Sequence, residues 1–169
     1  MNHNSNPKKM ESWSVVSMSY HRPEDQRILN AVLRTWFRSP KDLNLTDPRM
    51  PYPFSMTKWI KLSYLYPGAT TLVCKDSDWI VGHASYKPRR PGHFSLFHFI
   101  IDPRHRGQGI GGWFLDRILE QLRQNQAFSV ALRVSPKNPV AIRLYESRGF
   151  CVIGSTPQVL TMESTFSDK

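Results

Sequence analysis

A glycine cluster lies in the segment 102–113 (DPRHRGQGIGGW), between an apolar stretch and an amphipathic one. Glycine allows left-handed backbone angles and lets the main chain come close to a ligand. A helix that begins near Gly109 would leave its first N–H groups without acceptors, at the positive end of the helix dipole. This arrangement is typical of a site that binds phosphate or pyrophosphate. We therefore predict a phosphate-binding turn that includes Gly107, Gly109, Gly111 and Gly112.

The residues around this turn exclude two common nucleotide sites. No Gly-Lys-Ser or Gly-Lys-Thr follows the glycines, which disfavours a nucleoside-triphosphate P-loop. No strand-helix-strand unit with an acidic residue about 20 positions later supports a dinucleotide fold. Arg104, His105 and Arg106 add positive charge next to the turn. A different phosphate-bearing carrier remains, and the alternative is a glycine-rich turn that binds nothing.

A second group of residues lies in the segment 134–150 (VSPKNPVAIRLYESRGF). Asn138 suits the N-cap of a helix and Pro139 its first position. Tyr145 follows Asn138 by seven residues, so the two lie on nearly the same face of a short helix. The Tyr145 phenol can therefore reach a site shared with Asn138. The alternative is that Tyr145 only packs in the core.

Length and composition indicate one folded domain. The chain has 169 residues, of which 40% are hydrophobic and 12% aromatic, which permits a sizeable core and excludes disorder of the whole chain. No apolar run approaches the ~20 residues that cross a bilayer, and the first residues do not resemble a signal peptide. We expect a disordered N-terminus over residues 1–11, a single domain over residues 12–169, no membrane contact and a cytoplasmic location.

The charge and the cysteines limit the partners and cofactors. A net charge of +10, spread along the chain, favours an anionic partner such as nucleic acid, a membrane surface or a phosphate-rich cofactor. Cys74 and Cys151 are the only cysteines, which excludes a disulfide framework and a four-thiolate zinc site. Cys74 also lacks a standard metal-ligand spacing with His83, His93 or His98, so we expect no metal.

Hydrophobic patterns predict a run of strands with helices between them, hence a mixed α/β sheet. The predicted strands cover residues 12–20, 70–76, 79–87, 93–101, 129–134, 150–155 and 159–164. The predicted helices start at Pro23, after the cap Ser55, at Gly109 and at Asn138. Four prolines between residues 40 and 53 predict that the segment after the first helix is a loop.

Together the two motifs make the chain resemble the GNAT-type N-acyltransferase superfamily, which transfers an acetyl group from acetyl-CoA to an amine. The family's Arg/Gln-x-x-Gly-x-Gly/Ala signature is similar to Arg106, Gly109 and Gly111 here. Its later Asn…Ala…Tyr…Gly-Phe signature is matched by Asn138, Ala141, Tyr145, Gly149 and Phe150. The resemblance covers about residues 70–155. It implies a single-domain fold with a mostly antiparallel twisted sheet of about six to seven strands, flanked by four helices.

The resemblance also implies a role for each motif. The backbone of Phe99, Ile100 and Ile101 would pair with the pantetheine arm of acetyl-CoA. Asn138 would contact the same arm, and Tyr145 would be the general acid that protonates the departing CoA thiolate. The pyrophosphate would be held by the turn Arg106, Gly107, Gln108, Gly109, Ile110, Gly111 and Gly112.

A general base for the amine is harder to find. Family members often carry one on the strand before the glycine turn, on the face of Ile101, where strict alternation places Phe97. His98 would point to the other face unless a bulge intervenes, and Arg133 stands where some relatives carry a glutamate. Either a water chain, His93, His83 or Glu24 reaches the amine, or the acceptor has a low pKa and needs no base. The second hypothesis favours an α-amino, aromatic or hydrazine-like acceptor over a lysine side chain.

The acceptor itself is left open by these motifs. The resemblance implies that the region between the first strand and second helix, with Met50, Tyr52 and Phe54, holds it. The positive charge disfavours polyamines. Together with the missing base, this leads us to expect a small-molecule or peptide α-amine. Two alternatives are acetylation of aminoacyl-tRNA and a non-catalytic acyl-CoA-binding sensor module. Family members often form homodimers, which makes a homodimer possible here.

Overall fold

The computed structural model describes residues 10–167. The α-helices are α2 (Pro23–Trp36), α3 (Pro40–Thr46), α4 (Met56–Ser63), α5 (Ile110–Gln124) and α6 (Pro139–Glu146), and a 3-10 turn is η1 (Pro103–His105). The strands are β1 (Trp13–Met18), β2 (Thr70–Asp76), β3 (Trp79–Arg90), β4 (His93–Ile101), β5 (Ser129–Val134), β6 (Cys151–Ser155) and β7 (Leu160–Thr165). Residues 1–9, most of the predicted disordered N-terminus, lie outside the described residues.

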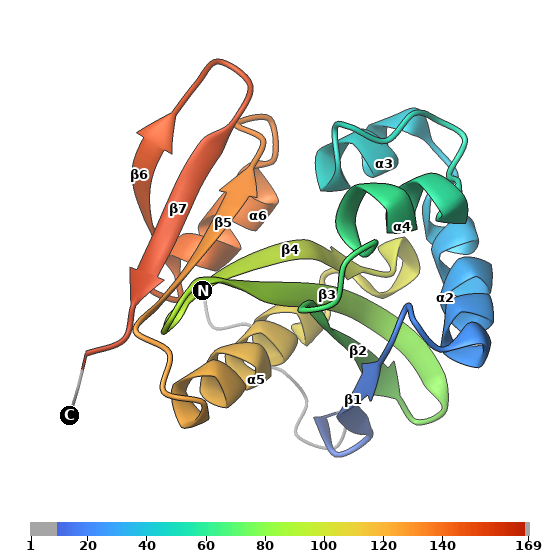
Figure 1. The fold of residues 1–169 in the computed structure, drawn as a ribbon, viewed down its shortest axis with the longest axis horizontal. Coiled ribbons are helices and arrows are strands. Elements are labelled where there is room, and N and C mark those ends of the chain that lie inside the picture. Colours follow the sequence, from blue (N-terminus) through green and yellow to red (C-terminus); the bar gives the residue numbers. More distant parts are fainter. Residues whose placement is uncertain (1–9, 168–169) are drawn as a thin grey trace.

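All seven strands form one sheet in the order β1-β2-β3-β4-β5-β7-β6 (Figure 1). Every neighbouring pair is antiparallel except β4 and β5, which are parallel. These two strands pair only where each begins, over 93–95 and 129–131. Beyond that they no longer share a ladder, so the sheet opens between them. The mixed, mostly antiparallel sheet predicted from the sequence is confirmed.

The helices cover the two faces of the sheet with two separate cores. In β2, Leu72 and Cys74 pack in the core that holds α5 and α6, whereas Val73 packs in the core that holds α2, α3 and α4. This alternation follows from the period of two along a strand. Figure 1 shows α5 along one side of the sheet and α2 with α4 on the other. Helix α5, which follows the glycine turn, therefore lies on the opposite face of the sheet from α3 and α4.

The prediction of a loop after the first helix is wrong for residues 40–46, which form α3. Ser39 caps this helix, since its hydroxyl accepts the N–H of Asp42 at 3.2 Å. Pro40 occupies the first helical turn, where a missing N–H costs nothing. Leu43 on the inner face is fully buried. The described residues thus contain five α-helices instead of the predicted four.

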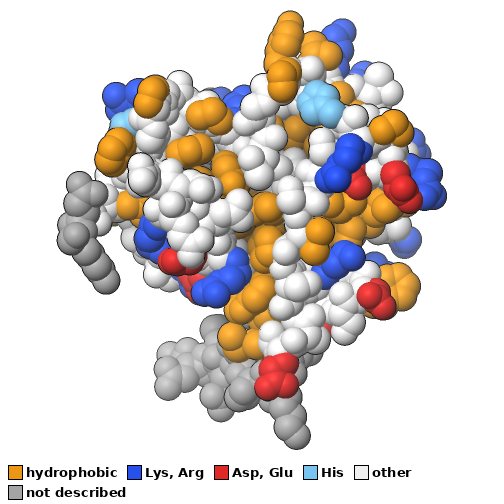
Figure 2. All heavy atoms as spheres, turned by 60° about the horizontal axis from the view of Figure 1, so that its bottom comes forward, with side chains coloured by type: hydrophobic (Ala, Val, Ile, Leu, Met, Phe, Trp, Pro, Cys, Tyr) orange, Lys and Arg blue, Asp and Glu red, His pale blue; other side chains and the backbone are white. Residues whose placement is uncertain are grey.

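On the face that Figure 2 shows, Lys and Arg side chains are scattered among Asp and Glu and form no single basic patch. Within residues 10–167, no helix is both long enough and apolar enough to cross a membrane. The net charge of +10 therefore does not by itself indicate a binding surface, and the charged residues of each site have to be considered separately.

Candidate active site

The glycine turn has the backbone geometry that a phosphate-binding turn requires. Gly107 and Gly109 have φ angles of 75° and 86°, in the left-handed region that favours glycine. Gly109 is the N-cap of α5 and offers no side chain to the helix amides. At this end of α5, the N–H of Trp113 donates to Gly109 O at 3.1 Å. The N–H groups of the three residues before Trp113 are free of intrahelical acceptors by helix geometry.

Two arginines hold the turn in place. Arg106 donates through Nε to Ile101 O at 3.2 Å and forms an ion pair with Asp42 of α3 at 3.7 Å. Arg148, just after α6, donates to both carboxylate oxygens of Asp116 on α5, at 3.1 and 3.3 Å. These contacts fix the start of α5 against β4, α3 and α6.

Asn138 and Tyr145 lie on α6, as predicted. Asn138 Oδ1 accepts the N–H of Ala141 at 3.3 Å, so this side chain caps the helix. The Tyr145 ring is buried, with its centroid 6.2 Å from that of Phe99 on β4 in an edge-to-face contact. Burial raises the pKa of Tyr145 well above its usual value, so the phenol is protonated at neutral pH. Tyr145 thus lies directly beside the strand predicted to bind the pantetheine arm.

The Tyr145 hydroxyl has no hydrogen-bond partner among the described residues and is not fully buried. Within the described chain, the only fully buried side-chain polar atom without a partner is Trp13 Nε1. The Tyr145 oxygen is therefore not sealed in the core.

A β-bulge in β4 changes which side chains face the cleft. Ser85 of β3 pairs with Phe97, but His83 pairs with Ile100, so His98 and Phe99 together oppose the single residue between Ser85 and His83. His98 adopts a φ of 51°, in the left-handed region. Strict alternation, which placed Phe97 on the face of Ile101, is therefore wrong. Phe97 and His98 both pack on the α2–α4 side.

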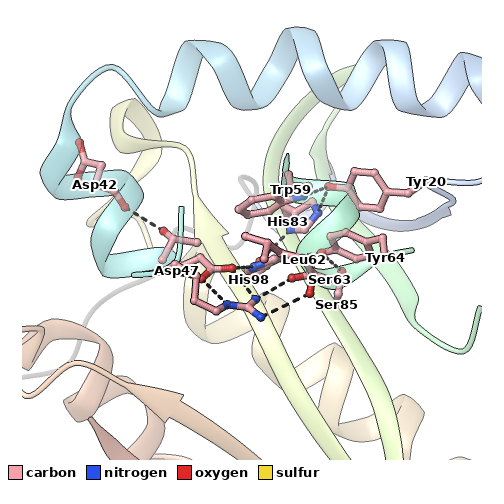
Figure 3. A network of polar contacts seen from close by, with 12 residues as sticks. Tyr20, Asp42, Asp47, Trp59, Leu62, Ser63, Tyr64, His83, Ser85 and His98 are labelled. Atoms are coloured by element: carbon pink, nitrogen blue, oxygen red, sulfur yellow. Dashed lines mark hydrogen bonds and ion pairs between the residues drawn. The ribbon is translucent and has the colours of Figure 1, made fainter. Parts of the chain in front are cut away.

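His83 holds the bulge through a chain of hydrogen bonds (Figure 3). The indole N–H of Trp59 donates to the Tyr20 hydroxyl at 2.9 Å, so this hydroxyl donates onward to Nε2 of His83 at 2.8 Å. The carbonyl of His98 can only accept, so Nδ1 of His83 carries the proton and donates to it at 2.8 Å. His83 is thus neutral, with both ring nitrogens occupied.

His98 is held in a second chain. Its ring stacks on Trp59 with centroids 3.7 Å apart. Nε2 contacts Asp47 at 2.8 Å, and Nδ1 contacts the Tyr64 hydroxyl at 2.8 Å, which continues to Ser85. Burial lowers the pKa of His98 more than Asp47 raises it, so the ring is neutral and donates from Nε2. Figure 3 shows both chains meeting at His98.

Both carboxylate oxygens of Asp47 already accept hydrogen bonds. Asp47 accepts from His98 and also from the Arg49 guanidinium, at 2.9 Å on Oδ1 and 2.8 Å on Oδ2. Burial alone would raise the pKa of Asp47, but these hydrogen bonds lower it far below its usual range. Asp47 therefore stays ionised and is a poor base.

Stability should fall when the solution is acidified. Burial lowers the pKa of His83 from 6.5 to about 3. Between these values the unfolded chain binds a proton at this site and the folded chain does not, so acid favours unfolding. The free energy of unfolding should drop by up to about 1.4 kcal/mol per pH unit below pH 6.5 for this group, and His98 acts in the same direction.

Urea unfolding at pH 7, 6 and 5 measures this slope. His83→Gln should flatten it, whereas His21→Gln, on the exposed surface, should leave it unchanged. Equal unfolding free energies of the unmodified protein at pH 7 and pH 5 would show that neither buried histidine is held neutral.

A cleft of about 730 Å³ lies on the α3–α4 side of the opening between β4 and β5. Its walls are residues 44–49 at and after the end of α3, residues 62–63 of α4, Lys87 and Arg89 of β3, residues 95–98 of β4, residues 131–137 of and after β5, and residues 157–159 and 161 of the β6–β7 turn and β7. None of the residues predicted to bind the cofactor lines it. Phe99, Ile101, Ile110 and Tyr145 belong to the α5-side core, whereas the side chain of Ile100 packs in the α2–α4 core.

The predicted bases do not reach this cleft. His83 is fully buried, and His93 contacts Ser129 at 2.7 Å at the beginning of β4. Glu24 lies on the exposed surface of α2, with Arg27 at 3.8 Å. Among the described residues that line the cleft, only Asp47 and His98 are bases by type, and their acceptor atoms are occupied. Asp47 was not identified from the sequence as a site residue, because no short motif contains both Asp47 and His98.

The described residues contain no group of three or more His, Cys, Asp or Glu side chains that could hold a metal ion. Met50 and Phe54, predicted to lie near the acceptor, are buried in the α2–α4 core, whereas Tyr52 is exposed. Tyr52 donates its hydroxyl to Arg38 O at 3.1 Å. The segment that was predicted to hold the acceptor therefore contributes mainly to core packing.

Comparison with known families identifies the fold. Residues 30–150 match the model of the acetyltransferase (GNAT) family, which is most of the chain. The chain belongs to the GNAT family. Two curated relatives are L-methionine sulfoximine/L-methionine sulfone acetyltransferase of Salmonella typhimurium and L-amino acid N-acyltransferase MnaT of Escherichia coli. They are 29% and 26% identical over 98 residues, which cover 54% and 56% of this chain and 56% and 57% of theirs. The chain thus spans little more than half the length of these relatives.

Solved GNAT structures share the architecture at low sequence identity. The GNAT domain of S. lividans PAT superposes with a TM-score of 0.75 at 16% identity, covering 90% of this chain and 89% of that one. Spermidine N-acetyltransferase from Vibrio cholerae, in complex with CoA and spermine, gives 0.70 at 17% identity, covering 92% and 96%. These likenesses establish the GNAT fold of this chain.

Proposed function

We propose that this GNAT protein is an N-acetyltransferase that moves the acetyl group of acetyl-CoA to a primary amine by direct attack in a ternary complex. One observation carries the proposal: the sheet opens between β4 and β5, with a glycine turn at a helix N-terminus on one side and a cleft on the other. A cofactor and an acceptor can then meet through the opening.

The residues of the α5 side fit coenzyme A. The N–H groups of 107–112 would bind the pyrophosphate, and the backbone of Phe99–Ile101 would pair with the pantetheine arm. Asn138 would lie near that arm, although its side-chain oxygen already caps α6. Bound acetyl-CoA supplies the activated acetyl group as a thioester.

Tyr145 would donate its phenolic proton to the sulfur of the departing CoA. The raised pKa of Tyr145 keeps this proton in place until a thiolate forms beside it. The same buried surroundings raise the proton affinity of a thiolate, so transfer from a weak acid becomes feasible. A backbone N–H near Ile101 would stabilise the negative oxygen of the acetyl group during attack.

The acceptor should be an amine that reaches the cleft already neutral. The occupied atoms of Asp47 and His98 leave the cleft without a free base among its described residues. This supports the hypothesis of a low-pKa acceptor, such as an α-amine. The names of the two curated relatives refer to amino acids and their analogues, which also carry an α-amine.

A thiol-release assay tests the proposal, with acetyl-CoA and a panel of amino acids, peptides, aminoglycosides, polyamines and charged tRNA. At pH 7 the neutral fraction of a peptide α-amine is roughly 300-fold that of a lysine side chain, from pKa values of about 7.8 and 10.4. We expect kcat/KM to favour peptide α-amines over lysine side chains by about that ratio, and the difference to shrink when rates are expressed per neutral amine. Lysine-type amines as the best substrates would contradict it.

Calorimetry with acetyl-CoA separates the alternatives. Heat of binding without turnover of any amine would favour the non-catalytic sensor module. Turnover with charged tRNA alone would favour the tRNA alternative. Absence of binding heat would reject the proposed function.

A further inference from the structure

The charged side chains that line the acceptor cleft are almost all cations. Its described walls carry five cationic side chains and one carboxylate, Asp47. The cations are Arg49, Lys87, Arg89, Arg133 and Lys137. Asp47 is already neutralised by Arg49 at 2.8 Å. The excess of positive charge therefore lies in the cleft where the acceptor amine of the proposed function would bind.

Three of these cations have no anionic partner within the described chain. Arg89 pairs with Glu163 at 3.3 Å, as Arg49 does with Asp47. The side chains of Lys87, Arg133 and Lys137 form no hydrogen bond or ion pair with described residues, and the Lys87 ammonium lies 5.3 Å from the centre of the Phe97 ring. This contact holds Lys87 on the cleft wall. Free cations from β3, β5 and the segment after β5 thus converge on one cavity.

Such a cavity selects ligands by charge. Neighbouring cations disfavour the protonated form of an amine and attract a carboxylate. Lys87, Arg133 and Lys137 are exposed, so solvent and salt screen part of this effect. A polyamine, with several ammonium groups, would be repelled. A single carboxylate next to the amine would instead be held, and Arg133 can bind it through two parallel N–H bonds.

We propose that the acceptor is an amine with a neighbouring free carboxylate, as in an α-amino acid, and that Lys87, Arg133 and Lys137 bind this carboxylate. The proposal rests on the proposed function. The size of the cleft, about 730 Å³, is that of a small-molecule site. The cations would have two effects, since they hold the carboxylate and lower the pKa of the amine beside it. They would thus partly replace the missing base.

The test compares each of the twenty common L-amino acids with its own α-carboxamide, which keeps the α-amine and removes the negative charge. Rates are expressed per neutral amine, because the amide changes the pKa of the amine. We expect the best amino acid to exceed its carboxamide at least about tenfold in kcat/KM. Equal values for every acid and amide pair would overturn the inference while leaving the acetyltransferase function intact.

Substitutions in the cleft test which residues bind the carboxylate of the acceptor. Lys87→Met and Arg133→Gln should each raise KM for the best amino acid about tenfold and leave KM for its carboxamide unchanged. The control is Lys58→Gln on α4, which is exposed and does not line the cleft, and it should leave both constants unchanged. If the variants instead weaken acetyl-CoA binding in calorimetry and leave KM for the amino acid as it was, the cations serve the cofactor and the inference fails.

Binding measurements keep the test independent of turnover. Titration of amino acid or carboxamide into the protein with saturating CoA, which has no acetyl group to transfer, gives the same comparison. Tighter binding of an acid than of its amide, lost in Lys87→Met, supports the inference even if thiol release is never observed. No preference for any acid overturns it.

Discussion

Replacing Tyr145 with phenylalanine is expected to lower kcat by about 10²- to 10⁴-fold, the range over which a general acid contributes. The substitution removes only the hydroxyl. The ring contacts with Phe99 and Phe150 remain, at centroid distances of 6.2 and 5.7 Å, so the fold and the opening beside β4 should be preserved. The departing CoA would then have to leave as an unprotonated thiolate. Steady-state thiol release measures kcat, and calorimetry should show unchanged acetyl-CoA affinity.

Tyr86→Phe is the matched control. Tyr86 is also buried in the α5-side core, and its hydroxyl accepts from Gln121 at 2.7 Å, away from the cleft. Its loss should cost some stability and leave kcat within about twofold, since a single hydrogen bond contributes only about 1 kcal/mol to folding. Equal turnover by Tyr145→Phe and the unmodified protein would remove Tyr145 from the role of general acid.

Replacing Gly109 with valine is expected to weaken acetyl-CoA binding about tenfold to a hundredfold. Gly109 has a φ of 86°, a conformation that costs a β-branched residue about 1–3 kcal/mol. The chain can relieve this strain by moving the turn, which would rotate the N–H groups of 110–112 away from a bound pyrophosphate. Calorimetric titration with acetyl-CoA measures the loss, and circular dichroism shows whether the fold is retained.

Gly154→Val provides the control for this variant. Gly154 lies in β6, where no left-handed angle is required and a Cβ would meet Thr161 at an ordinary 3.9 Å. A valine there suits a strand and should leave acetyl-CoA affinity unchanged. An unchanged dissociation constant for Gly109→Val would mean that the glycine turn does not hold the pyrophosphate, and the proposed function would lose its main support.

Local sequence signals were sufficient for most elements. The predicted strand 93–101 and the predicted strand 129–134 have the observed bounds. The caps Ser55 and Asn138 start α4 and α6 through side-chain acceptance of backbone N–H groups, as their residue types favour. These features depend on residues within a few positions of one another. The error at α3 came from counting Pro40 as a helix breaker, although it lies in the first turn.

The amino-acid sequence by itself determined the glycine turn, the helix that carries Tyr145 and the family resemblance, because each depends on contiguous residues. Only the tertiary structure decided which groups share the cleft. The bulge that turns His98 toward α4 has no local signature, and it brings His98 to Asp47, 51 positions away in the chain, and to Tyr64, 34 positions away. Lys87 and Arg133 likewise come together because β4 lies between β3 and β5 in the sheet. It pairs antiparallel with β3 and parallel with β5. Burial and partner geometry, which decide whether a base is free and whether a cation is paired, exist only once these distant segments have packed together.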